Sequence, residues 1–189
     1  MQYFEEQTFQ QIDYSKHTLG IGEYECCTFK SCDFSNVNLS NFKFIECEFS
    51  ECNLSNARLD ETSFQIVQFS NCKMIGLQFE SCNQFGLSLE FSDCSLNHSS
   101  FYQNKLKKTR FTNCQLQEIE FSDCDLQEAK FDNCDLTRAI FRNSNLEKAD
   151  FSSAFNFSID PEHNKMKKAL FSQGGLIGLL GKYDIEIVN

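Results

Sequence analysis

The chain has 189 residues, enough for one domain with a sizeable core, and it contains 21 Phe, no Trp and a single Pro. Its formal net charge is −10, and the acidic excess is uneven: residues 1–100 hold 5 basic and 14 acidic residues, whereas the rest of the chain holds 12 and 13. This charge argues against binding to a nucleic-acid backbone, which needs Lys and Arg to displace counterions, and the lack of any run of 18 apolar residues excludes a membrane helix.

The N-terminal stretch MQYFEEQTFQQIDYSK has neither a basic start nor an apolar segment. A secretory signal peptide needs both. We therefore expect a cytoplasmic protein without membrane attachment.

From the N-terminus onward, a large apolar residue, here called a centre, occupies almost every fifth position. One series runs from Phe4 to Phe79, and a second runs from Phe91 to Phe151. The residue two places before most centres is small or apolar, and the other three places are mostly polar. Such a five-residue unit has two inward residues that it cannot bury alone, so the pattern predicts a solenoid of stacked units.

Residues 124–141, CDLQEAKFDNCDLTRAIF, illustrate this pattern. The stretch resembles the pentapeptide-repeat family, whose motif is A(D/N)LXX. The resemblance implies an all-β solenoid, a right-handed quadrilateral parallel β-helix with four such units in each coil. We expect this β-helix over residues 1–157, followed over residues 158–189 by a short helical cap that is also a dimerisation segment.

A period of 20 is visible in two series of cysteines, which are Cys32, Cys52, Cys72 and Cys94, Cys114, Cys134. Between the two series the period slips, because Phe91 lies two places further from Phe79 than two regular units would put it. Two inserted residues would join the two series into one column. A seven-residue loop in place of one unit would also give acceptable columns, but we prefer the two-residue insertion because it keeps more columns uniform.

The eleven cysteines raise the question of a metal site or disulfides. All except Cys26 lie two places before a centre. Their spacings of 5, 10 and 20 send the sulfurs to different walls or coils, whereas a zinc site needs short spacings that converge on one point. We therefore expect free thiols that act as small core residues, with no metal and no cofactor. His17, His98 and His163 have no triad context, so we expect no enzymatic activity.

The segment Ser81–Phe91, SCNQFGLSLEF, interrupts the repeat. Gln84 stands where Phe or Leu is expected and is followed by Phe85 and Gly86. Such a bulge is either a tolerated insertion or a binding feature. The segment resembles a run in the quinolone-resistance (Qnr-type) branch of the pentapeptide-repeat family, through the pieces FG, LEF and SDC.

A basic group, NKLKKTRF, follows the bulge and contains Lys105, Lys107, Lys108 and Arg110. It spans two predicted walls, and its side chains could pair with neighbouring carboxylates. Qnr-type proteins carry a larger projecting loop near this place, but here the spacing from Phe101 to Phe111 stays at five.

The repeat fades after residue 156. ALFS at 169–172 resembles one further unit, residues 174–181 predict a short apolar helix, and YDIEIV alternates like a final strand. This segment is either a cap over the open edge of the last coil or a contact between two chains, since its apolar residues cover more than one helix face. We favour a homodimer joined through the C-termini. The expected interface residues are Leu176, Ile177, Leu179, Leu180, Tyr183 and Ile185.

The family resemblance also implies a function, that of a DNA-mimicking protein that binds DNA gyrase or topoisomerase IV and protects it from quinolones or toxins. The alternative is a scaffold with an unrelated partner, since the fold does not decide between them. The acidic surface is likewise either a device for solubility or a surface that competes with nucleic acid for a basic partner. We expect a protein partner and no direct nucleic-acid binding. The candidate contact residues are Glu46, Glu48, Glu51, Asp60, Glu61, Glu80, Asn83, Gln84, Phe85 and Glu90.

Overall fold

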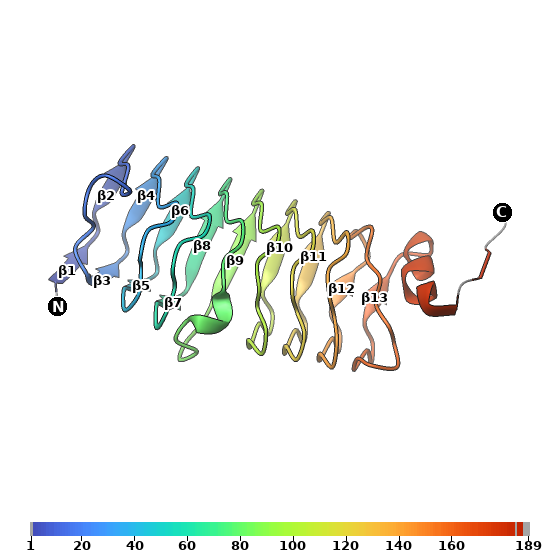
Figure 1. Cartoon of the computed structure of the whole chain (residues 1–189). Coiled ribbons are helices and arrows are strands. Elements are labelled where there is room, and N and C mark those ends of the chain that lie inside the picture. The colour runs from blue at the N-terminus through green and yellow to red at the C-terminus, as the bar shows by residue number, and fades with distance from the viewer. Residues whose placement is uncertain (1, 184, 187–189) are drawn as a thin grey trace.

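The chain forms a rod. The computed structural model describes residues 2–183 together with residues 185 and 186. The rod is a right-handed, four-sided parallel β-helix of about eight coils, with a short helical cap near its C-terminal end (Figure 1). The expected fold class is confirmed. Within the described residues, no helix combines the length and apolarity needed to span a membrane.

Two of the four walls carry extended strands, all paired in parallel. Wall 1 holds a four-stranded sheet, whose strands in order are β1 (Gln2–Glu5), β3 (Gly22–Glu25), β5 (Lys43–Ile45) and β7 (Ser63–Gln65). Wall 2 holds a nine-stranded sheet, whose strands in order are β2 (Thr8–Gln10), β4 (Thr28–Lys30), β6 (Glu48–Ser50), β8 (Val67–Ser70), β9 (Leu89–Ser92), β10 (Arg110–Thr112), β11 (Lys130–Asp132), β12 (Asp150–Phe151) and β13 (Leu170–Phe171).

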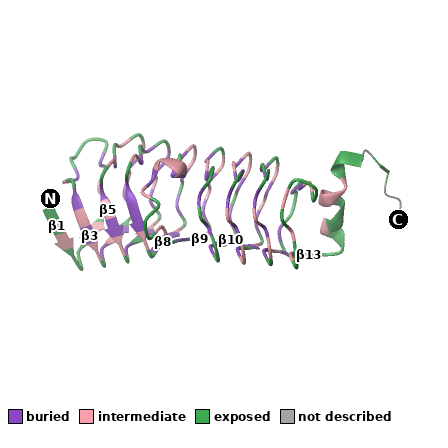
Figure 2. Ribbon diagram, turned by 90° about the horizontal axis from the view of Figure 1, so that it is seen from below, coloured by how far each residue is buried: buried purple, intermediate pink, exposed green. Residues whose placement is uncertain are grey.

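Walls 3 and 4 are built from isolated parallel bridges, such as Asp13 to Asp33 on wall 3 and Asn38 to Arg58 on wall 4. Beyond β7, wall 1 continues in the same way from Lys105 onward. In each unit the centre points inward and its two neighbours point outward. This alternation gives each coil a buried inner face and an exposed outer one (Figure 2).

The pairing register gives the length of the break in the repeat. Lys43 pairs with Ser63, one regular period further along the chain, but Val67 pairs with Leu89, which lies two places beyond that period. The regular period then returns, as in the pair Arg110 and Lys130. Two extra residues in this coil are therefore confirmed, and they fit both the two-residue insertion and the seven-residue loop in place of one five-residue unit.

The interior of the rod is a set of stacked aromatic and aliphatic columns. On wall 2 every centre is Phe, and the rings of successive coils stack with centroids 4.7–5.5 Å apart and nearly parallel planes. The nine members are Phe9, Phe29, Phe49, Phe69, Phe91, Phe111, Phe131, Phe151 and Phe171. Rings on the opposite walls 2 and 4 meet edge to face, as Phe111 and Phe121 do at 5.8 Å, so each of these rings packs in two directions.

Between the units, one residue turns each corner with a left-handed backbone. Besides two glycines, a long series of non-glycine residues has a positive φ, and nearly all of them lie two places after a centre. Asn and Asp tolerate this region, because their short side chains can bond locally, whereas β-branched residues are strained in it. Ile66, with φ of 57°, is the β-branched member of the set.

All eleven cysteines are free thiols, and all are buried except Cys26, as the repeat predicts. Their sulfurs donate to backbone carbonyls, as Cys47 Sγ does to the Tyr24 oxygen at 3.2 Å. Burial raises the pKa of Cys47 to about 12. The Cys47 thiol therefore stays protonated, and like the other buried cysteines it serves as a small core group.

At the C-terminal end the coil continues past residue 157. β13 pairs with β12, and the Phe171 ring lies parallel to that of Phe151 at 5.3 Å, so the predicted ALFS unit is formed. The last coil thus takes in residues 158–172, which the sequence pattern assigns to the cap. The cap consists of two 3₁₀-helices, η2 (Gly174–Leu179) and η3 (Gly181–Tyr183).

The predicted final strand in YDIEIV is not formed at its described residues. Tyr183 belongs to η3, and Ile185 and Glu186 lie in no strand. The other positions of this stretch lie outside the described residues. The alternating pattern finds no adjacent strand to pair with at residues 183, 185 and 186.

Candidate functional site: a bulge and the acidic wall beside it

The bulge consists of residues 83–88 and projects from wall 1 in the coil that follows β7. Its first turn is held by a hydrogen bond from the Phe85 amide to Asn83 Oδ1 at 2.9 Å. Gln84 ties the bulge to its surroundings, because its Nε2 donates to the Cys82 carbonyl at 3.0 Å and its Oε1 accepts from Asn104 Nδ2 at 2.9 Å. The chain then turns back at Gly86, where φ is +70° and an added Cβ would lie 3.3 Å from the Gln65 side chain.

Gln84 does not point into the core as its place in the repeat predicts. It is exposed, and Leu87 packs against the core three residues later. The two extra residues free the chain from its five-residue period. An apolar side chain therefore takes the interior place, and the amide stays outside, where it finds partners.

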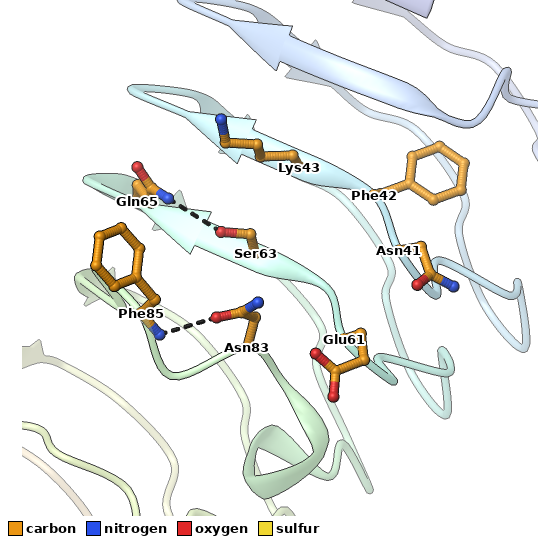
Figure 3. Close-up of a pocket in the computed structure, with 8 residues that line it drawn as sticks. All are labelled: Asn41, Phe42, Lys43, Glu61, Ser63, Gln65, Asn83 and Phe85. Atoms are coloured by element: carbon orange, nitrogen blue, oxygen red, sulfur yellow. Dashed lines mark hydrogen bonds between the residues drawn. The ribbon is translucent and has the colours of Figure 1, made fainter. Parts of the chain in front are cut away.

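Phe85 is the most exposed large apolar residue of the described chain, with 81% of its surface accessible. It lines a groove with seven other residues of walls 1 and 4, which are Asn41, Phe42, Lys43, Glu61, Ser63, Gln65 and Asn83. Figure 3 shows Phe85 beside Gln65, with Phe42 on the far side of Ser63. The predicted contact residues Glu61, Asn83 and Phe85 are thus brought together.

The other predicted acids are distributed over several walls. Glu48 and Glu90 lie on wall 2, in β6 and β9, and line a shallow depression with Gln68 between them. Asp60 and Glu80 lie on wall 4. The corner residues are Glu46 between walls 1 and 2 and Glu51 between walls 2 and 3. The predicted set therefore does not form one surface.

Several of these acids already have partners. Asp60 forms an ion pair with Arg58, and Glu90 lies 3.7 Å from Arg110. Glu51 accepts a hydrogen bond from Ser31 at 2.7 Å. Burial raises the pKa of Glu80, one of whose carboxylate oxygens has no hydrogen-bond partner among the described residues.

Four acids that the sequence analysis did not single out lie on wall 1, in and beside β1 and β3, and they are Glu5, Glu6, Glu23 and Glu25. The Tyr3 hydroxyl donates to Glu25 at 2.7 Å, and this bond to a carboxylate raises the Tyr3 pKa. Their common wall could have been found from the sequence, because Glu5 and Glu25 occupy matching places in successive coils and Glu6 and Glu23 belong to the same two units.

Two side chains of the basic group after the bulge are paired with carboxylates, as expected. Lys108 lies 3.9 Å from Glu128 on wall 1, and Arg110 pairs with Glu90 on wall 2. Across the described residues, no group of three or more His, Cys, Asp or Glu side chains is arranged to hold a metal.

The predicted dimer residues fall into two groups. Leu176, Ile177, Tyr183 and Ile185 are 47–60% exposed. Leu179 packs against the core and Leu180 is half-buried, so these two help to seat the cap on the last coil. The exposed face continues onto β13, where Leu170 is 53% exposed.

Comparison with known proteins identifies the family. A profile of the pentapeptide repeat region matches residues 23–90 and 77–151. The chain belongs to the pentapeptide-repeat family. Among curated proteins, none matches it in sequence.

Among solved structures, pentapeptide-repeat proteins have the same fold. Full-length QnrB1, a plasmid-mediated fluoroquinolone resistance protein, matches with a TM-score of 0.61 and 17% identity, over 97% of this chain and 100% of QnrB1. HetL from the cyanobacterium Nostoc sp. strain PCC 7120, which is involved in regulating heterocyst differentiation, matches with a TM-score of 0.46 and 14% identity, over 89% of this chain and 85% of HetL. At 17% identity the likeness to QnrB1 concerns the fold alone.

Proposed function

We propose that this pentapeptide-repeat protein is a non-enzymatic DNA mimic that binds a type II topoisomerase, DNA gyrase or topoisomerase IV, and protects it from quinolones or toxins. The observation that carries the proposal is the end-to-end likeness to QnrB1, which extends over nearly the whole of both chains. The acidic N-terminal half adds support, because a partner surface built for DNA is basic.

The chemistry of the surface also favours binding over catalysis. The thiols are buried, apart from Cys26, and the acids are spread over the outer faces of several walls. An active site combines a cleft with titratable groups of shifted pKa. Glu80 has a raised pKa, but it stands apart from the groove beside Phe85.

We further propose that the segment 158–189 joins two rods end to end. Four apolar side chains of this segment are about half exposed, next to the equally exposed Leu170. A symmetric contact would cover this face on both copies at once.

A supercoiling assay tests the main proposal. The purified protein is added at micromolar concentration to DNA gyrase, with and without ciprofloxacin. We expect inhibition of supercoiling, or recovery of supercoiling in the presence of the drug. If neither effect occurs with gyrase or with topoisomerase IV, the proposal is wrong, and the alternative of a scaffold for an unrelated partner is favoured.

A further inference from the structure

Wall 1 changes its charge at the bulge. From β1 to the bulge, the wall and its two corners carry six carboxylates, which are Glu5, Glu6, Glu23, Glu25, Glu46 and Glu61. Lys43 is the basic side chain on this part of the described wall, and it is paired with Glu23 at 3.0 Å. Beyond the bulge the wall begins with Lys105, Lys107 and Lys108. The acidic wall, defined as wall 1 from β1 through the bulge, is therefore a separate electrostatic surface.

Two apolar side chains stand on the bulge end of the acidic wall. Phe85 is 81% exposed beside the groove, and Ile66, at the corner after β7, is 59% exposed and lines a separate hollow with Lys108 and Arg110. Ile66 also holds a left-handed backbone, which is strained for a β-branched residue. Neither side chain packs into the core, so folding does not explain them. Exposed apolar groups ringed by charge are typical of protein-binding surfaces.

We propose that the acidic wall is the partner-binding surface, and that its occupant is a Lys- and Arg-rich protein segment that places one apolar side chain in the groove beside Phe85. This inference rests on the proposed function for the identity of the partner, but the chemistry of the occupant follows from the wall. A nucleic acid would set phosphates against the carboxylates, and a second copy of the wall would do the same with its own acids. A basic polypeptide satisfies both the charge and the apolar groove.

Cys26 provides a reporter on this surface. It is the exposed thiol of the eleven, and it lies at the corner that follows β3. A photo-crosslinker attached to Cys26 will capture whatever binds the acidic wall. The matched control is Asn36→Cys in a Cys26→Ser background, because Asn36 turns the opposite corner of the same coil with a similar φ of 58°.

Two probes separate this inference from the proposed function. They are purified DNA gyrase and a short synthetic peptide of lysines around one phenylalanine. We expect both to crosslink to the Cys26 label and not to the Asn36→Cys label, and duplex DNA to crosslink to neither. If the peptide crosslinks to Cys26 but gyrase binds nowhere, the topoisomerase proposal fails and the acidic wall stands. If gyrase is inhibited but crosslinks only to the Asn36→Cys label, the wall assignment is wrong and the topoisomerase proposal stands.

Substitutions test the residues of the wall. We expect the triple variant Glu25→Gln, Glu46→Gln, Glu61→Gln to weaken peptide binding about tenfold, since it removes three exposed ion pairs with the peptide. The control triple variant Asp93→Asn, Asp123→Asn, Asp132→Asn makes the same change of charge away from the acidic wall and should stay within about twofold. Equal loss in both triple variants would show that only net charge matters and would overturn the inference.

The apolar groups have their own test. Phe85→Ala and Ile66→Asn should each weaken binding several-fold. Asn favours the left-handed corner, so Ile66→Asn should not lower thermal stability, and its loss of binding is not a folding defect. Unchanged affinity in both variants contradicts a role for the groove.

Discussion

At the scale of single residues, each place in the five-residue unit makes its own demand. The centre must be large and apolar, the place two before it small, and the place two after it able to adopt a left-handed backbone. Cys meets the second demand, and Asn, Asp and even Glu meet the third. Residues that meet no such demand, such as Phe85 and Ile66, are therefore the informative ones.

The reactivity of Cys26 gives a prediction at this scale. Partial burial, and then the negative charges of Glu46 and Glu25, raise its pKa. Below that pKa the reactive thiolate is a minority, so removing a negative charge lowers the pKa and increases the thiolate fraction. We expect Glu46→Gln to accelerate alkylation of Cys26 roughly twofold near neutral pH.

The measurement is the rate of maleimide labelling of the native protein as a function of pH, read by mass spectrometry. One thiol should react before unfolding, since the other ten cysteines are buried. Glu48→Gln is the control, because Glu48 lies on wall 2 and does not perturb Cys26. If both substitutions accelerate the labelling equally, the placement of Cys26 beside the acids of wall 1 is wrong.

At the scale of elements, stability lies in the columns that run along the rod and not in single coils. Each coil pairs only with the coils before and after it, and each Phe ring of wall 2 stacks on the rings of those two coils. The bulge interrupts the wall 1 sheet after β7, while the wall 2 sheet passes it without a break. Continuity of the Phe column explains how the rod tolerates two inserted residues.

The column predicts a large cost for one truncation. Phe111 is fully buried and stacks at 5.1 Å on both Phe91 and Phe131. Phe111→Ala should lower the free energy of unfolding by about 3–5 kcal/mol, because it leaves a cavity between stacked rings. Phe85→Ala removes the same phenyl ring from a side chain that is 81% exposed. This variant should change the free energy of unfolding by less than about 0.5 kcal/mol. Chemical denaturation of both variants measures the difference, and similar values for the two would be incompatible with the column.

The seating of the cap depends on a close approach at Gly178. An added Cβ would collide with the Phe157 carbonyl oxygen and lie 2.6 Å from its ring. Gly178→Ala should therefore lift η2 from the last coil and break the hydrogen bond from the Ile159 amide to the Gly178 carbonyl, which measures 2.9 Å. Hydrogen exchange at Ile159 should become faster. Gly174→Ala is the control, since nothing lies within 4 Å of its added Cβ, and it should leave the exchange unchanged.

At the scale of the whole molecule, the two ends and the two halves of the rod differ. The N-terminal half is acidic, and the C-terminal end presents exposed apolar side chains around η2 and β13. A surface of this kind at one end of a rod favours association end to end.

This end contact gives a test by substitution. Ile177→Ser should shift the molar mass from that of a dimer to that of a monomer in light scattering. Ile21→Ser is matched in exposure, since both isoleucines are 60% exposed, but it lies near the N-terminal end and should leave the mass unchanged. A monomeric wild-type protein, or an effect of both substitutions alike, contradicts the end-to-end dimer.

Much of the architecture follows from the sequence because the repeat is local: each five-residue unit displays its inward and outward places wherever it stands. The period of 20, the two extra residues at the break and the buried thiols are all readable from spacing, and the structure confirms them. The extent of the last coil and the 3₁₀ form of the cap could not be read from the spacing, because both depend on packing against residues far away in the chain.

The tertiary structure alone decided two kinds of feature: side-chain directions where the period fails, and contacts where separate coils meet. Once two residues are inserted, spacing no longer says whether Gln84 or Leu87 turns inward, and the outcome depends on hydrogen bonds to Asn104 and on contact with the core. The acids chosen as neighbours in the sequence lie on different walls, whereas acids one coil apart share a wall. Stacking of coils brings distant residues together, and for this reason the sequence by itself determined the rod, while its three-dimensional assembly decided which carboxylates form a surface with Phe85.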